Sequence, residues 1–230
     1  MKPTIITDLD GTLANIMNEV LATLHLRFDI PLIPEDCDTY DVAASFWPLL
    51  DGHCKLTSEA ELTSFLDEAL WQDPDVYERA LPYWDLWQAY RLGLRCGAIS
   101  LVALTGRPDS TPVMDATLRW LHDWGFDGIE CFFSRTYPGG KLEVVRDILE
   151  AQQDSPGLVA SEHPIWVIED DLSAARAIQE ALPSITVFVV DRPWTSRYWR
   201  ETDGVIKCRY ITQEIGELLD QCRRTQGVGQ

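Results

Sequence analysis

Asp8 and Asp10 stand on either side of a single leucine in the segment "ITDLDGTLA". An apolar run ends at Asp8, and the Gly-Thr pair Gly11–Thr12 follows Asp10. Two carboxylates at this spacing repel each other. A solvated turn would explain the pattern, and for this step alone it is the simpler interpretation. The alternative is a site in which one carboxylate is a nucleophile and metal ligand while the other is an acid.

Two further apolar runs also end in residues that can do chemistry. One leads into Thr105 and the segment "LTGRP", and another leads into Glu169 and Asp170 in "EDD". In an open parallel sheet, ligands bind outside the carboxyl ends of the strands, so we expect Asp8 and Asp170 to be neighbours. Crowded carboxylates raise each other's pKa unless a cation offsets them, and oxygen ligands without His or Cys select Mg²⁺. Together these residues favour a site over a set of unrelated loop acids.

The elements that would position these residues alternate between strand and helix. Five apolar, β-branched runs predict buried strands, at residues 4–8, 99–105, 129–134, 164–170 and 185–191. Helical spacing follows three of them, at residues 110–125, 141–153 and 172–182. Strand alternating with helix predicts an α/β fold, a doubly wound, Rossmann-like domain with a five-stranded parallel sheet.

The long segment after the first strand has a different sequence pattern, because residues 14–95 contain no convincing strand. Residues 58–71 begin with a capping-box pattern, Ser58 to Glu61, and residues 82–93 also have helical spacing. We therefore expect a small α-helical cap, residues 14–91 (the helical insert), over the carboxyl edge of the sheet. The core would comprise residues 1–13 and 92–224, with a polar loop near 151–163 and a flexible tail at 225–230.

Charge and composition limit the partners of the chain. The formal net charge of its 230 residues is −18, which argues against an extended nucleic-acid surface. It permits a small anionic substrate, since one divalent metal and a few donors can dominate the local field. No apolar run is long enough to span a membrane, and "MKPTIITDLD" lacks the pattern of a secretory signal, so we expect a cytoplasmic protein.

Four motifs in order along the chain resemble those of the haloacid dehalogenase (HAD) superfamily of Mg²⁺-dependent phosphatases and phosphomutases. They are "ITDLDGTLA", "VALTGRP", Lys141 in "GGKLEVV", and "VIEDDLSAA". The helical insert sits where this superfamily places its cap. Haloacid dehalogenases lack the second aspartate and transport ATPases carry Thr there, so Asp10 favours a phosphatase or a phosphomutase.

The resemblance implies a role for each motif residue. Asp8 would attack phosphorus and form an aspartyl-phosphate, and Asp10 would protonate the leaving alkoxide and then activate water. Thr105 and the Gly106 amide would hold phosphoryl oxygens, and Lys141 would neutralise charge on Asp8 and the phosphoryl group. The metal ligands would be Asp8, the Asp10 carbonyl, Asp170 and Glu169, the last as a ligand or a neighbour of the ligands. Arg107 would either contact the substrate or cap a strand end.

A narrower resemblance concerns the helical insert. "IPEDCDTYDVAASFW", "ALPYWDLWQAYRLG" and "VVDRPWTSRY" are similar to the 5′(3′)-deoxyribonucleotidase group, which has a helical C1-type cap. That group stacks cap aromatics on the base of its substrate, and here Phe46, Trp47 and Trp71 would serve. The alternative for each is ordinary core packing.

The resemblance implies a Mg²⁺-dependent phosphomonoesterase acting through an aspartyl-phosphate on a small (deoxy)nucleoside monophosphate. A sugar-phosphate phosphatase or phosphomutase and a polynucleotide phosphatase are alternatives within the same chemistry. A non-catalytic ligand-binding protein is an alternative of another class, but it would be expected to have lost one of the motif residues, and none is lost.

Overall fold

The computed structural model describes residues 3–52, 56–153, 164–200 and 204–208, together with residues 213, 216, 217 and 220. Most of the polar loop predicted near 151–163, and the predicted tail at 225–230, lie outside these residues.

In the part of the chain that the structure describes, the centre is one parallel sheet of six strands in the order β5-β4-β1-β6-β7-β8. Its members are β1 (Thr4–Asp8), β4 (Ser100–Thr105), β5 (Glu130–Phe133), β6 (Ile165–Glu169), β7 (Thr186–Val190) and β8 (Ile206–Cys208). All five predicted strands are confirmed, but the expected number of strands was wrong by one. The edge strand β8 has only three residues, "IKC", and a lysine in the middle, so it shows no apolar run.

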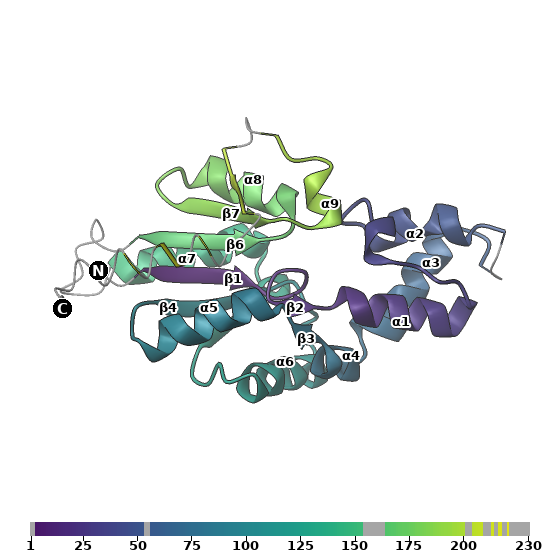
Figure 1. Cartoon of the computed structure of the whole chain (residues 1–230), viewed down its shortest axis with the longest axis horizontal. Helices are drawn as coiled ribbons and strands as arrows, with labels where there is room; N and C mark the ends of the chain where they lie inside the picture. The colour runs from purple at the N-terminus through teal and green to yellow at the C-terminus, as the bar shows by residue number, and fades with distance from the viewer. Residues whose placement is uncertain are drawn as a thin grey trace.

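Helices cover both faces of this sheet, as a doubly wound fold requires (Figure 1). Consecutive residues of β1 point to opposite faces, so Ile5 and Ile6 enter two separate cores. Helices α5 (Trp84–Arg95) and α6 (Thr111–Asp123) supply the core around Ile5, and α7 (Gly140–Gln153) and α8 (Leu172–Ala181) supply the core around Ile6. The predicted α/β class is thereby confirmed.

The helical insert lies beyond the carboxyl edge of the sheet (Figure 1). Its elements are α1 (Met17–Phe28), η1 (Pro34–Asp36), α2 (Val42–Leu50), α3 (Glu59–Leu66), the π-helical turn η2 (Asp67–Trp71) and α4 (Pro74–Arg79). Ser58 caps α3 by accepting a hydrogen bond from the Glu61 amide at 3.3 Å, while the Glu61 carboxylate accepts from the Thr57 amide at 2.7 Å. The start of α3 is therefore built almost as the sequence pattern predicts.

Two very short strands connect the insert to the sheet domain. β2 (Ala14–Asn15) and β3 (Leu81–Pro82) pair in antiparallel fashion, so the two connections of the insert run side by side. The expectation that residues 14–95 contain no strand was therefore wrong, because two-residue strands show no periodicity in a sequence. The expected division at residues 91 and 92 falls within α5, and the division into core and cap stays a prediction. Among the described residues, no helix has the length and apolar character of a membrane span.

Candidate active site

The chemistry-bearing residues gather at the carboxyl ends of three adjacent strands. Asp8 is the last residue of β1, Thr105 the last of β4 and Glu169 the last of β6. Because β1 pairs with both β4 and β6, these three ends meet at one edge of the sheet. The predicted proximity of Asp8 and Asp170 follows from this topology, and the structure confirms it.

A lysine from the following helix joins two of these carboxylates. The Lys141 ammonium, in the first turn of α7, donates to Asp8 Oδ1 at 2.8 Å and to Glu169 Oε2 at 2.7 Å. Burial opposes its charge, but Asp8 and Glu169 outweigh burial and raise the pKa of Lys141 well above its ordinary value. Lys141 is therefore a permanent cation held against the carboxyl end of β1.

Three buried acids, Asp8, Glu169 and Asp170, offer oxygens that lie within 4.8 Å of one another. Burial, and then the charge of Glu169, raise the pKa of Asp8 to about 8 despite Lys141. Burial and the charge of Asp8 raise the pKa of Asp170 well above its ordinary value. One ammonium does not balance three ionised carboxylates, so the cluster either retains protons or needs a further cation.

These residues fit a divalent cation. Asp8 Oδ2 is buried and has no hydrogen-bond partner among the described residues, a costly arrangement for a carboxylate oxygen unless a ligand pairs with it. An all-oxygen set of carboxylates suits Mg²⁺. The resemblance to the HAD superfamily adds the Asp10 carbonyl to these ligands, and that assignment stays a prediction.

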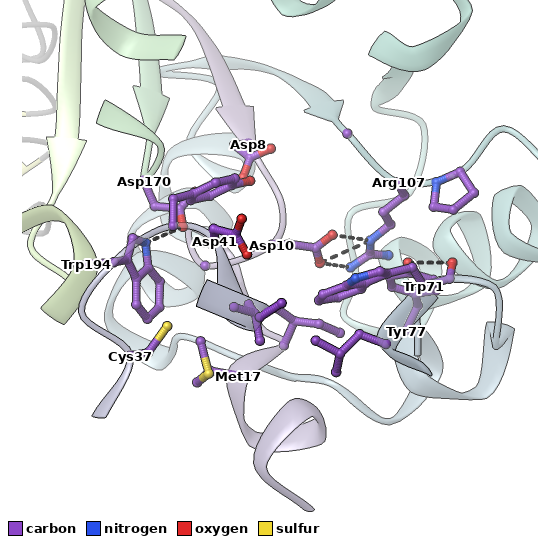
Figure 2. A pocket seen from close by; sticks show the side chains of 18 of the residues that line it. Asp8, Asp10, Met17, Cys37, Asp41, Trp71, Tyr77, Arg107, Asp170 and Trp194 are labelled. Carbon is purple, nitrogen blue, oxygen red and sulfur yellow. Dashed lines mark hydrogen bonds and ion pairs between the residues drawn. The ribbon is translucent and has the colours of Figure 1, made fainter. Parts of the chain in front are cut away.

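The loop after β1 is shaped around Asp170. The Trp194 indole, from α9 (Pro193–Ser196), donates to Asp170 Oδ2 at 2.9 Å (Figure 2). The Thr12 hydroxyl approaches Asp170 Oδ1 at 3.4 Å. Gly11 has φ +78°, and a Cβ there would lie 1.9 Å from Asp170 Oδ2. Only glycine combines this backbone conformation with such close approach.

The same loop is fixed from its other side by Arg192. The Arg192 guanidinium donates to the Gly11 carbonyl at 2.6 Å and to the Thr12 carbonyl at 3.2 Å. It also lies 3.5 Å from the ring centre of Tyr83, at the end of the helical insert. This arginine therefore connects the site loop, β7 and the insert.

Asp10 has its own cationic partner, Arg107. The Arg107 Nε and Nη2 donate to the Asp10 carboxylate at 3.0 Å and 2.6 Å (Figure 2). The Arg107 Nη1 donates to the Thr117 hydroxyl at 3.1 Å. The Arg107 side chain is fully buried, with the Tyr77 ring centre 4.3 Å from its guanidinium carbon. The charge of Arg107 is thus already paired within the protein. From the sequence we expect a substrate contact or a strand-end position for Arg107, and this pairing was not predicted.

Thr105 and Gly106 form the turn that leads into Arg107. The buried Thr105 hydroxyl accepts a hydrogen bond from the Arg107 amide at 3.1 Å. Gly106 borders open space, since a Cβ there would meet no atom within 4 Å. Their predicted contacts with phosphoryl oxygens stay predictions.

A cavity of about 390 Å³ opens over these residues, between the sheet edge and the helical insert. Asp8, Asp10 and Asp170 line it on the sheet side (Figure 2). Apolar side chains of the insert line it opposite, and they include Ile16, Met17, Val42, Leu66 and Trp71. The cavity is thus polar where the acids cluster and apolar where the rest of a ligand would lie, which is the ordinary character of a small-molecule site.

Of the three insert aromatics proposed to touch substrate, the structure brings only Trp71 to the cavity. Phe46 is fully buried, because it shares the inward face of α2 with Ala43 and Leu50. Trp47 is partly buried against the same core and does not line the cavity. The structure therefore does not bring Phe46 or Trp47 to this cavity.

Two residues that the sequence reasoning did not single out also line the cavity. Tyr40 exposes 52% of its surface, yet burial of its phenol and then the charge of Asp170 raise its pKa well above the ordinary value. Arg135, in η3 (Ser134–Thr136), donates from Nε to the Gly106 carbonyl at 2.6 Å. Neither belongs to a sequence pattern that could have identified it.

Comparison with solved structures finds the same fold in hydrolases of the HAD superfamily. A HAD-superfamily hydrolase, subfamily IA, from Geobacter sulfurreducens aligns at 17% identity and TM-score 0.59, over 95% of this chain and 96% of its own. A protein described as a predicted phosphoglycolate phosphatase, from Haemophilus somnus, aligns at 14% identity and TM-score 0.58, over 94% and 97%.

The HAD hydrolase YfnB from Bacillus subtilis, whose structure contains magnesium, aligns at 16% identity and TM-score 0.56, over 95% of this chain and 99% of its own. No protein-family model and no curated protein matches the sequence. The likeness therefore lies in the fold, and the chemistry has to be argued from the site.

Proposed function

We propose that this protein is a Mg²⁺-dependent phosphomonoesterase that acts through an aspartyl-phosphate at Asp8. The observation that carries the proposal is the state of the Asp8 carboxylate. One oxygen is held by the Lys141 ammonium at 2.8 Å, and the other is buried without a hydrogen-bond partner beside Glu169 and Asp170. A carboxylate fixed in this way at the border of a cavity is a nucleophile with its attacking direction already set.

The reaction would proceed in two displacements at phosphorus. An Asp8 oxygen attacks and forms the acyl-phosphate bond as the ester P–O bond breaks, and Asp10 gives its proton to the departing alkoxide. Asp10 then takes a proton from a water molecule, whose oxygen attacks phosphorus and releases inorganic phosphate while Asp8 regains its carboxylate. Lys141 stabilises the charge on the transferred group throughout.

The metal would be held by Asp8, Asp170 and Glu169, with the Asp10 carbonyl as a further ligand. When bound, Mg²⁺ supplies positive charge that offsets the crowded carboxylates and the phosphoryl oxygens. The likeness in fold to a hydrolase whose structure contains magnesium supports this choice of ion.

For the substrate, we propose a small phosphate ester with a flat, partly apolar leaving group, and specifically a (deoxy)nucleoside monophosphate. A cavity of about 390 Å³ suits a ligand of this size. Trp71 gives its wall an aromatic ring, and every nucleobase has a π-face that can stack on such a ring. The net charge of −18 disfavours a polynucleotide.

A panel of phosphate esters tests this function. Phosphate release would be measured with Mg²⁺ from ribo- and deoxyribonucleoside monophosphates, phosphoglycolate, sugar phosphates and a 3′-phosphorylated oligonucleotide. Asp8→Asn provides the blank, and Asp147→Asn, the same change at an exposed site on α7, is the matched control. Fast release from mononucleotides that depends on Asp8 and not on Asp147 supports the proposal. Equal release from sugar phosphates would reject the nucleotide substrate, and release unaffected by Asp8→Asn would reject the mechanism.

A further inference from the structure

Apart from the Mg²⁺ proposed above, the charged side chains that line the cavity disfavour an anionic substrate, because most of them are carboxylates. Four aspartates line it, Asp8, Asp10, Asp41 and Asp170. The Lys141 ammonium is shared between Asp8 and Glu169, and the Arg107 guanidinium is held by Asp10. A phosphate dianion entering this cavity therefore meets several carboxylates, and the two buried cations are already paired.

Arg135 is the exception. It lines the cavity and, among the described residues, it forms no ion pair with a carboxylate. Its side chain lies at the surface, so the guanidinium is accessible to a ligand arriving from solvent. It thus offers positive charge that a ligand can use without breaking a pair inside the protein.

The position of Arg135 is fixed by the turn after β4. The buried Ser134 hydroxyl donates to the Thr105 carbonyl at 3.0 Å, and Arg135 Nε donates to the Gly106 carbonyl at 2.6 Å. The guanidinium is therefore attached to the backbone of the same turn that borders the open cavity at Gly106. With Nε engaged, Nη1 and Nη2 form no hydrogen bond with the described residues.

A planar guanidinium with two free amino groups matches the geometry of phosphate oxygens, and it binds them through two parallel hydrogen bonds. We propose that Arg135 is an anion-binding residue of this site, which contacts the phosphate of the substrate and of the inorganic product. The role rests on the proposed phosphatase function, because it assigns the anion to the same cavity. This role assigns a function to the loop before Lys141, which the sequence motifs left without one.

Binding of inorganic phosphate tests this role without turnover. Titration calorimetry with Mg²⁺-loaded protein would compare the parent chain with Arg135→Gln, Arg135→Lys and Arg146→Gln. Arg146 is exposed on α7, so its variant removes the same charge away from the cavity. Arg135→Gln should weaken phosphate binding about tenfold, as expected for loss of a charge-assisted contact, and Arg146→Gln should leave it unchanged.

The dependence of phosphate binding on salt separates an ionic contact from a structural effect. With Arg135→Gln the affinity should fall less steeply with added salt than in the parent chain, while Arg135→Lys should restore the slope but only part of the affinity. Unchanged affinity and slope in Arg135→Gln, or no phosphate binding by the parent chain, would overturn the proposal. Arg135-dependent phosphate binding by a chain that hydrolyses no ester would reject the proposed function and leave this inference standing.

Discussion

The Arg107 guanidinium holds the Asp10 carboxylate through two of its nitrogens, at 3.0 Å and 2.6 Å, across 97 residues of sequence. The arginine side chain is fully buried, whereas Asp10 keeps 23% of its side-chain surface exposed toward the cavity. The pair thus joins a rigid, buried cation to an acid that a substrate can reach. In the proposed mechanism, this contact sets the direction in which Asp10 exchanges its proton.

Replacing Arg107 should therefore damage both stability and catalysis. Arg107→Gln would leave the Asp10 charge without its partner and open a gap beside Tyr77, lowering the free energy of unfolding by about 3 kcal/mol. Arg107→Lys keeps the charge but cannot bind the Asp10 carboxylate through two nitrogens. We therefore expect kcat to decrease strongly, while the free energy of unfolding decreases less than in Arg107→Gln. Urea unfolding and steady-state kinetics would check both. A variant Arg107→Gln as stable and active as the parent would show that the pair has no such role.

Gly11 allows a second prediction, because both its backbone and its surroundings exclude a side chain. Gly11→Ala would combine a left-handed φ of +78° with a Cβ at 1.9 Å from Asp170 Oδ2, so the loop must move and metal binding should be lost. Gly97 is the matched control, since it has φ +64° but free space around a Cβ. Gly97→Ala should cost only about 1 kcal/mol of strain and keep the activity. Calorimetric titration with Mg²⁺ would distinguish the two variants. Full metal binding by Gly11→Ala would contradict the predicted clash with Asp170.

The raised pKa of Asp8 predicts how pH acts on the metal-free protein. Asp8 has a pKa of about 8 when folded and near 4 when unfolded, so the folded chain binds more protons between these values. Its contribution to stability must then decrease as pH rises from about 5 to about 8. Mg²⁺ binding requires the unprotonated carboxylate, so the gain in Tm on adding Mg²⁺ should be larger at pH 8 than at pH 6. Equal gains at both pH values, or the same pH dependence in Asp8→Asn, would contradict this.

Trp71 and Trp47 provide a paired test of the substrate. Both are partly buried in the helical insert, but only Trp71 lines the cavity. Trp71→Ala should raise KM for a mononucleotide about tenfold through loss of stacking, and Trp47→Ala should not. KM for a small non-aromatic ester should change little in either variant. If Trp47→Ala raised KM as much as Trp71→Ala, the placement of the base would be wrong.

The sequence predicted the sheet and the edge at which the candidate site lies because the signals are local. The strands β1, β4 and β6 are continuous apolar runs that end in Asp, Thr and Glu, so the position of the candidate site follows from strand polarity alone. β8 escaped prediction since three residues with a lysine carry no such signal. The burial of Phe46 could not be predicted, because the sequence of a helix does not show that Phe46, Ala43 and Leu50 pack inward together.

Long-range pairings could not be predicted from the sequence, for a different reason. Arg107 could bind substrate or protein, and only the fold brings Asp10 within 3 Å of it. Arg135 lies in a loop without periodicity, and its relevance depends on the 2.6 Å contact with Gly106, which no local pattern encodes.

The proposed mechanism requires Asp8 to carry the phosphoryl group, and this intermediate can be trapped. Asp10→Asn would be incubated with Mg²⁺ and p-nitrophenyl phosphate, whose leaving group needs no proton, so that the first displacement proceeds while the second is slowed. Mass spectrometry of the quenched protein should then find one added phosphoryl group, mapped to Asp8. A parent chain that hydrolyses the ester while Asp10→Asn gains no phosphoryl group, or gains one on another residue, would contradict the account.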